Sequence, residues 1–190
     1  MDNMLEVKVL GRGGFGVVSS AQILGRVFLE LGFWATSIPR FGAERQGAPV
    51  HADVRISSTK IRIKSFLDKG DLTIVLDQNA FQVQEILSYS KPKGVVVING
   101  SVNDKYESDR NQREFLFIEG TKLSLAKFNS PIANIIILGS IFKLLGITDL
   151  ELISKQVLIS LPFLEEKQIN QMLEIGSSKT NVLDRLRIIR

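Results

Sequence analysis

The sequence contains no cysteine among its 190 residues. It therefore offers no disulfide, no thiol nucleophile and no thiolate ligand for zinc or for an iron–sulfur cluster. Histidine is almost as scarce, because His51 is the only one, and this excludes a site built from several imidazoles. If the protein takes part in redox chemistry, another chain must hold the electron carriers.

Long apolar runs are also missing. The longest nearly apolar stretch, residues 132–142, has about half of the ~20 residues that a membrane span needs, and Asn134 interrupts it. The first ten residues lack the basic start, the apolar run and the small-residue cleavage site of a secretory signal. We therefore expect a cytoplasmic protein that has no membrane segment.

The net charge is small, at +4, which is modest for a protein that binds nucleic acid. Residues 1–69 contain ten Lys or Arg and six Asp or Glu, so the whole excess lies in this third of the chain. A local positive balance suits an anionic ligand or an acidic partner. A solvated surface with scattered charges is an equally open alternative. We expect no nucleic-acid partner.

The first forty residues predict a strand, a glycine turn, a helix and a second strand. A strand over residues 6–10 leads into the turn Gly11–Gly16. Apolar residues then recur every three or four positions from Val17 to Leu31, which is the spacing of one helix face. Gly32 is a stop signal for that helix, and a strand over 33–38 follows it.

The rest of the chain continues the α/β pattern and then becomes helical. Further strands are expected over residues 50–56, 60–64, 72–76, 95–98 and 115–118. Helices are expected over residues 80–87, 132–145 and 149–161, and one more helix reaches residue 175. A loop over 40–49 and a turn over 92–94 lie between these elements. The strand over 60–64 alternates apolar and basic residues, as an edge strand with one wet face does. Thr148 and Glu151 form a capping-box pattern for the third of these helices. We predict an α/β fold: a three-layer α/β/α, Rossmann-like domain with an open, mostly parallel sheet and a helical C-terminal part. The domain covers residues 1–175, and residues 176–190 form a tail that could dock on a partner.

The glycine turn matches the pattern G-x-G-x-x-G through Gly11, Gly13 and Gly16. Glycines allow a sharp turn and let backbone N–H groups and a helix dipole face an anion. A nicotinamide site also needs an acidic residue after the second strand, and none lies between Glu30 and Glu44. A tight turn that only packs helix against sheet is the structural alternative.

Two segments together resemble the gamma subunit of pyruvate (2-oxoacid):ferredoxin oxidoreductases. The first is GRGGFGVV over residues 11–18, and the second, about 25 residues later, is FGAERQGAPV over residues 41–50. The Ala-Pro pair in the second segment resembles the pyruvate or branched-chain type more than the 2-oxoglutarate type. Weaker matches extend the resemblance over about residues 5–160. The family usually has glutamine at the position of Phe15.

The resemblance implies a subunit that is inactive alone. Such complexes convert a 2-oxoacid and coenzyme A to an acyl-CoA and CO₂ and pass two electrons to ferredoxin. The expected partners are alpha, beta and ferredoxin-like delta subunits, with ferredoxin as the acceptor of the complex. Thiamine diphosphate and the iron–sulfur clusters are expected in those partners, with no cofactor bound by this chain alone, and contact with coenzyme A is left open.

The candidate cofactor-binding residues are those of the two motifs. They are Gly11, Arg12, Gly13, Gly14, Gly16, Glu44 and Arg45. Arg45 could bind a phosphate or a neighbouring subunit, with Glu44 orienting it, or the two could form a local ion pair. Arg12 could meet an anion or be a plain surface residue. We expect no catalytic residue and no metal ligand in this chain.

Three other polar residues have structural interpretations that we favour. Asp77 follows a strand, where a ligand group could lie, but an aspartate there more often caps the next helix. His51 has no titratable partner in its motif, so we expect an ordinary half-buried histidine. Asn134 is expected to bond to backbone or to the loop over 44–49.

Two rival functions remain open on the sequence alone. One is a stand-alone nucleotide- or coenzyme A-binding regulatory module that uses the glycine turn. The other is a diverged scaffold that keeps the fold but has lost the complex, which the departure at Phe15 makes conceivable. Ligand titration and an Arg45→Ala variant separate these from the subunit.

Overall fold

The computed structural model describes residues 4–41, 48–109, 112–181 and 186. Its elements along the chain are β1 (Leu5–Arg12), α1 (Val17–Glu30), β2 (Trp34–Phe41), β3 (Pro49–Ser57), β4 (Gly70–Val75), η1 (Gln78–Ala80), α2 (Val83–Ser88), β5 (Ser90–Asn99), η2 (Asp104–Asp109), β6 (Glu114–Ile118), α3 (Gly120–Phe128), α4 (Asn134–Leu144), α5 (Leu150–Ser160) and α6 (Glu166–Ser177). None of the described helices combines the length and the apolar character needed to cross a bilayer.

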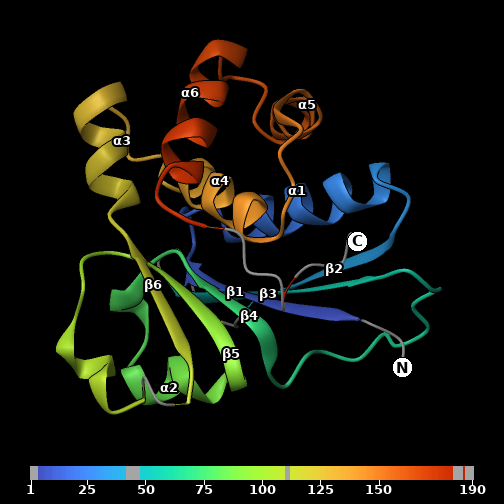
Figure 1. Ribbon diagram of the computed structural model, residues 1–190, viewed down its shortest axis with the longest axis vertical. Coiled ribbons are helices and arrows are strands. Elements are labelled where there is room, and N and C mark those ends of the chain that lie inside the picture. Colours follow the sequence, from blue (N-terminus) through green and yellow to red (C-terminus); the bar gives the residue numbers. More distant parts are fainter. Residues whose placement is uncertain (1–3, 42–47, 110–111, 182–185, 187–190) are drawn as a thin grey trace.

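The strands form one mixed sheet in the order β2-β3-β1-β4-β5-β6 (Figure 1). β1, β4, β5 and β6 pair in parallel, whereas β3 is antiparallel to both β1 and β2. Five strands therefore run in one direction and only β3 opposes them, among the described strands. The prediction of an open, mostly parallel α/β sheet is confirmed.

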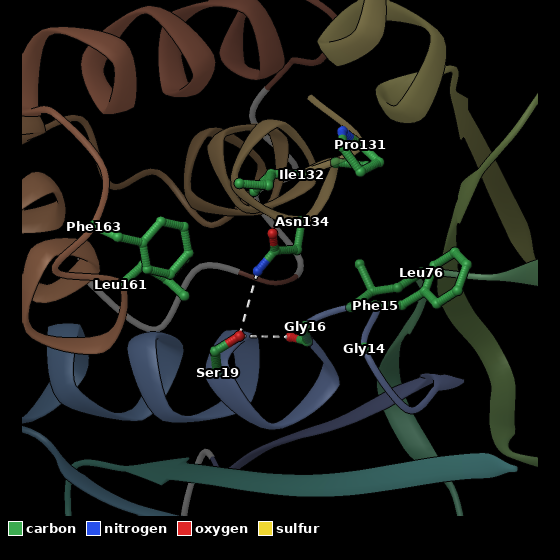
Figure 2. Close-up of a pocket in the computed structure, with 11 residues that line it drawn as sticks. Gly14, Phe15, Gly16, Ser19, Leu76, Pro131, Ile132, Asn134, Leu161 and Phe163 are labelled. Atoms are coloured by element: carbon green, nitrogen blue, oxygen red, sulfur yellow. Dashed lines mark hydrogen bonds between the residues drawn. The ribbon is translucent and has the colours of Figure 1, made fainter. Parts of the chain in front are cut away.

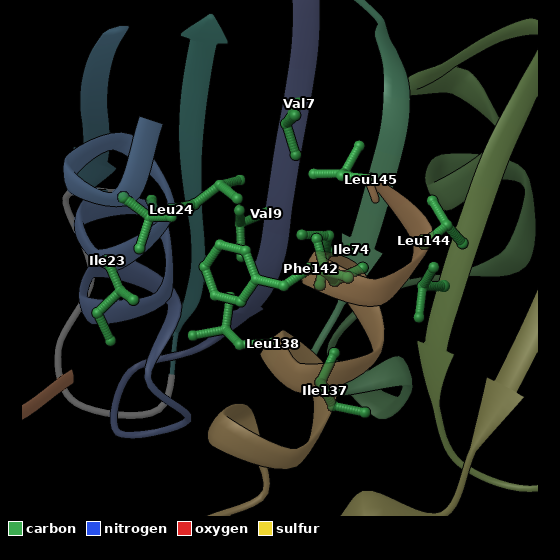
Figure 3. Close-up of a cluster of buried hydrophobic side chains, with 14 of the residues drawn as sticks. Val7, Val9, Ile23, Leu24, Ile74, Ile137, Leu138, Phe142, Leu144 and Leu145 are labelled. Atoms are coloured by element: carbon green, nitrogen blue, oxygen red, sulfur yellow. The ribbon is translucent and has the colours of Figure 1, made fainter. Parts of the chain in front are cut away.

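One face of the sheet carries most of the apolar core. Inward side chains of β1, such as Val7 and Val9, lie beneath α1 and α4, where Phe142 fills the space between the two helices (Figure 3). α4 is buried nearly all the way round, as its uniform apolar sequence predicts. α6 lies over α4 and α5 lies over α1, both farther from the sheet (Figure 1).

α4 and α6 approach each other backbone to backbone. A Cβ atom on Gly139 would collide with the Leu173 carbonyl, and one on Gly176 would collide with the Ile136 carbonyl. The Ser140 hydroxyl donates to the Gly176 carbonyl oxygen over 2.7 Å. Two glycines that face each other's helix therefore allow a contact that larger residues would prevent.

The second face of the sheet is covered by two different kinds of structure. Over β4 and β5, α2 and η2 bury a small apolar cluster that includes Ile86 and Tyr106. Over β1 and β3 no helix lies among the described residues; residues 58–69, named here the basic strap, cross this part of the sheet instead (Figure 1). The predicted strand over 60–64 is wrong, because the strap makes no ladder and its backbone bonds go to side chains.

An ion cluster holds the strap on the sheet. The Lys8 ammonium lies 2.9 Å from one Asp53 oxygen, and Arg40 lies 2.9 Å from the other. Asp53 also accepts a hydrogen bond from the Leu67 N–H, and the Leu67 carbonyl accepts from both cations. Lys8 and Asp53 are each 1% exposed. Burial lowers the pKa of Lys8, and the Asp53 carboxylate opposes that shift.

Smaller differences from the sequence predictions are local. Arg40, Phe41 and Pro49 belong to strands, so the loop after β2 is shorter than predicted. The helix predicted over 80–87 is divided into η1 and α2, and the turn predicted over 92–94 lies within β5, where Lys93 has a φ of 64°. The capping box on Thr148 is wrong by one residue, because Asp149 is the N-cap and accepts from the Leu152 N–H.

The proposed division at residue 175 stays a prediction. α6 continues to Ser177, and most of the tail lies outside the described residues. Leu186 is the only described residue beyond 181, and it is buried against the main core.

We expect Asp53→Asn to lower the free energy of unfolding by about 3 kcal/mol, because it leaves the Lys8 ammonium buried beside a neutral amide. Chemical denaturation measures this. The double variant Lys8→Met/Asp53→Asn should recover part of the loss, since it removes the buried charge. Asp149→Asn is the matched control on an exposed cap, where Asn serves as well as Asp. Equal effects of the two Asp→Asn changes would show that the buried pair contributes nothing.

Candidate functional site

The glycine turn between β1 and α1 adopts the conformation that its sequence predicts. Gly14 and Gly16 have φ values of 93° and 78°, in the left-handed region that favours glycine. Gly16 is the N-cap of α1, and no side chain caps this helix end. The first N–H groups of α1 therefore face the edge of the sheet without a side-chain partner.

Gly16 is also held by a close contact. A Cβ atom there would collide with the amide of Asn134, at the start of α4. The Asn134 amide nitrogen donates to the hydroxyls of Ser19 and Ser20, each over 3.4 Å. Our expectation of a bond from Asn134 to backbone is not met among the described residues, and residues 44–47 of the loop that we named as the other partner lie outside them. The amide instead joins the starts of α1 and α4.

Arg12 and Asp77 meet where the chain changes direction across the sheet. Arg12 is the last residue of β1 and Asp77 follows the neighbouring parallel strand β4, so both lie at the carboxyl ends of strands, where open α/β sheets bind ligands. The Arg12 Nε donates to Asp77 Oδ2, and the guanidinium lies 5.2 Å from the centre of the Phe15 ring. Asp77 also accepts from the Asn79 N–H, so its predicted capping role is confirmed, here for η1.

A cleft of about 740 Å³ opens beside this ion pair, and we call it the polar cleft. It is lined by Arg12, Phe15, Leu76, Asp77, Gln78, Asn79, Asn99, Gly100, Ser101, Glu119, Thr121, Lys122, Leu125 and Ala126. The Asn99 side chain ties its floor together by donating to the Leu76 carbonyl and the Thr121 hydroxyl, each over 2.9 Å. Arg12, with a side chain that is 40% exposed, can therefore reach a ligand in the cleft while Asp77, at 4%, stays buried behind it.

A second cavity of about 400 Å³ adjoins the polar cleft at Phe15 and Leu76, and we call it the apolar cavity (Figure 2). It is lined by Gly14, Phe15, Gly16, Ser19, Leu76, Pro131, Ile132, Ala133, Asn134, Leu161 and Phe163. Phe15 and Leu76 line both spaces, and Phe15 is 40% exposed, so its ring borders the two. The resemblance leads one to expect glutamine at this position, and its polar amide would line the two spaces differently from a phenyl ring.

His51 is an ordinary half-buried histidine, as predicted. Its ring packs edge-on against Phe81 and Tyr89, with centroid distances of 5.3 and 5.0 Å. Burial lowers the pKa of His51, and the positive charges of Lys8 and Arg40 lower it further. The imidazole is therefore held neutral on the second face of the sheet.

The structure brings five of the seven predicted binding residues to one edge of the sheet. Gly11, Arg12, Gly13, Gly14 and Gly16 form the turn, whereas Glu44 and Arg45 lie outside the described residues. The described flanks of that loop end beside the turn, because Pro49 pairs with Arg12 and the Gly13 N–H donates to the Ala48 carbonyl over 3.3 Å.

Sequence reasoning missed much of the cleft's wall. Asn99 follows a predicted buried strand, a position that could have marked it as a ligand-edge residue. Thr121 and Lys122 stand on α3, which the sequence pattern did not predict. Phe163, which lines the apolar cavity, follows α5 and was not singled out either.

Gly16→Ala and Gly14→Ala form a matched pair that isolates the contact with Asn134. Both place a side chain at positive φ, which costs about 1 kcal/mol, but a Cβ on Gly14 has nothing within 4 Å. We expect Gly16→Ala to lower the free energy of unfolding by about 1–2 kcal/mol more, because it displaces the amide from its hydroxyl partners. In a denaturation cycle with Asn134→Ala, the difference should shrink. Equal costs for both glycines would refute the contact.

Comparison with known proteins places these features in a family. The pyruvate ferredoxin/flavodoxin oxidoreductase family matches residues 6–171. The chain is 31% identical over 157 residues to the pyruvate/ketoisovalerate oxidoreductases common subunit gamma of Pyrococcus furiosus, covering 81% of this chain and 85% of that protein.

Solved structures of related proteins share the fold of this chain. The pyruvate oxidoreductase subunit PORC of Thermotoga maritima superposes with a TM-score of 0.73 at 25% identity, over 93% of this chain and 96% of that one. The 2-oxoglutarate:ferredoxin oxidoreductase of Magnetococcus marinus shares the fold at 19% identity, with a TM-score of 0.80 over 98% of this chain and 33% of its own. The resemblance drawn from the two sequence motifs is confirmed: the chain belongs to the pyruvate ferredoxin/flavodoxin oxidoreductase family.

Proposed function

We propose that this chain is the gamma subunit of a pyruvate-type 2-oxoacid:ferredoxin oxidoreductase and helps to enclose coenzyme A. The observation that carries the proposal is the ligand edge of the sheet, where the family's glycine turn, Arg12 and the polar cleft lie together. The complex converts a 2-oxoacid and coenzyme A to an acyl-CoA and CO₂. The two electrons released by this oxidation pass to ferredoxin.

The electron-carrying and carbanion chemistry belongs to partner chains. A chain without cysteine has no thiolate for an iron–sulfur cluster. We assign thiamine diphosphate and the clusters to the alpha, beta and ferredoxin-like delta subunits. The role of this chain is then to bind and to orient coenzyme A.

Coenzyme A fits the donor set of the polar cleft. Its phosphates are anions, and the cleft offers them two cations: the Arg12 guanidinium, and the exposed Lys122 ammonium, which lies 3.3 Å from Glu119 in the free chain. Asp77 holds Arg12 in place through Nε, which leaves the terminal nitrogens of the guanidinium for a phosphate. The related 2-oxoglutarate enzyme was solved with coenzyme A and succinyl-CoA bound.

A stand-alone nucleotide-binding module is the second candidate, and the relatives do not favour it. The Pyrococcus furiosus relative, of which 85% is covered, is named as a common subunit. A module that acts alone would need no partner chains. A melting-temperature titration with coenzyme A, NADP and ATP tests this candidate directly, because a ligand that binds only the folded chain raises its stability by mass action.

We expect the purified chain alone to show no 2-oxoacid oxidation, and the anaerobically purified, tagged chain to bring thiamine-diphosphate and iron–sulfur subunits with it. Mass spectrometry identifies the partners, and acyl-CoA formation measures the activity. Arg45→Ala should weaken assembly or lower turnover, whereas a diverged scaffold would show little change. Activity of the bare chain, or its recovery without partners, would refute the subunit assignment.

Arg12→Ala should raise the KM for coenzyme A about tenfold in the assembled enzyme, because it removes one charge-assisted contact with a phosphate. The KM for the 2-oxoacid and kcat at saturating coenzyme A should stay the same, since Arg12 does not touch the reacting carbon in this proposal. Lys155→Ala, an exposed cation on α5, is the control. An unchanged KM for coenzyme A would remove Arg12 from the binding site while leaving the subunit assignment standing.

A further inference from the structure

The basic strap presents charges that the rest of the described chain does not neutralise. Lys60, Arg62, Lys64 and Lys69 are exposed, and none of them forms an ion pair with a described residue. Asp68 is the only carboxylate within residues 58–69. A local excess of about three positive charges therefore lies on one short segment.

The carboxylates of the sheet beneath the strap are already used. Asp53 is enclosed by Lys8 and Arg40, and Glu6 pairs with Arg55 and Lys91. These ion pairs lie within the fold, so the outward charges of the strap have no carboxylate partner among the described residues. An external acidic group is what would neutralise them.

Large apolar side chains lie among these charges. Ile63 is 48% exposed, Phe66 is 53% exposed, and Trp34 at the start of the edge strand β2 is 48% exposed. Lys60 lies 5.8 Å from the Trp34 ring centre, which joins the edge strand to the strap as one surface. Exposed aromatic residues combined with arginine are the composition of protein interfaces.

The strap is held in place before any partner arrives. Arg55 donates to the Ser65 carbonyl oxygen over 2.6 Å, and Leu67 is bound through both its N–H and its carbonyl group to Asp53, Lys8 and Arg40. The segment has no ladder partner, so its position depends on these side chains. A surface fixed in this way loses less conformational entropy on binding than a free loop does.

We propose that the strap and Trp34 form a docking surface for an acidic segment of another protein, one whose carboxylates flank an apolar residue. A protein fits better than a nucleic acid, because a cation lies over each ring on which a base would stack: Arg40 is 3.9 Å from the Phe66 ring centre and Lys60 is over Trp34. Ile63 and the exposed parts of the two rings remain for an apolar side chain. A protein also fits better than a membrane, since the strap is not an amphipathic helix. This inference goes beyond the proposed function, because it concerns a different surface from the polar cleft.

Trp34 makes the docking surface measurable, because it is the only tryptophan in the chain. Residues 60–66 span at most about 25 Å when extended, so a peptide of about twelve residues covers them. The probe is a synthetic glutamate-rich peptide with two leucines, titrated against the full isolated chain at low salt while Trp34 emission is recorded. Its lysine-for-glutamate counterpart, an oligoadenylate RNA and phosphatidylglycerol vesicles are titrated in parallel.

We expect the acidic peptide to saturate a change in Trp34 emission, and Lys60→Glu/Arg62→Glu/Lys64→Glu to weaken this binding at least about tenfold. The matched control reverses three exposed lysines far along the chain, Lys155→Glu/Lys167→Glu/Lys179→Glu, and should bind within about twofold of the unaltered chain. If the triple strap variant does not fold, Arg62→Glu alone should still weaken binding measurably.

Several results would overturn the proposal. They are the absence of any saturable change, equal binding of the lysine peptide, equal losses in the strap and control variants, or a stronger response to RNA or vesicles than to the acidic peptide. The isolated chain is sufficient for this test, so its failure is independent of whether a complex is recovered.

Discussion

The parallel pairing of β1 with β4 is the constraint on which the rest of the structure depends. Its register, from Val7 beside Leu72 to Leu10 beside Val75, brings the carboxyl ends of both strands to the same edge. The chain leaves β1 toward β2 and leaves β4 toward β5, so the two connections diverge and open a cleft between them. Arg12 and Asp77 meet there because Arg12 ends β1 and Asp77 follows β4, although 65 positions separate them in sequence.

The two faces of this sheet are stabilised by different kinds of interaction. The face beneath α1 and α4 is a continuous apolar core, which is non-directional and tolerates many combinations of side chains of similar volume. The face beneath the strap relies on Lys8, Asp53 and Arg40, where each oxygen and each cation needs a partner at hydrogen-bond distance. Such a cluster fixes the position of an irregular segment of which Leu67 is the only apolar side chain that is fully buried.

This contrast explains which parts of the fold could be predicted from the sequence. The glycine turn, α1 and the central strands follow from local spacing, and the structure confirms them. The strap could not be predicted, because its alternating residues 60–64 have the local pattern of a strand while distant residues on β1, β2 and β3 bind its backbone. The N-cap at Asp149 instead of Thr148 was a choice between two adjacent capping residues, which local pattern alone does not separate.

The candidate site shows the same division. The turn that holds Arg12 was visible in the sequence, whereas Phe163 and Lys122 reach the two spaces beside Phe15 from helices and turns far along the chain. Asp77 was recognised as a cap, but its bond to Arg12 depends on strand order, which the sequence does not state. Local patterns thus identified the residues, and only the sheet topology showed which of them lie together.

A chain that has no cysteine for thiol or iron–sulfur chemistry can still control a reaction through binding. Interactions with the parts of a substrate that do not react lower KM when they act equally on ground and transition states, and they raise kcat only when they tighten in the transition state. Arg12 stands over Phe15 between a buried carboxylate and an open cleft, an arrangement suited to holding an anion away from the reacting bond. Because the Phe15 ring borders both the polar cleft and the apolar cavity, it limits how much of the two spaces such a ligand can occupy. The contribution of Phe15 is then to the shape of the two spaces, because a phenyl ring has no proton to transfer.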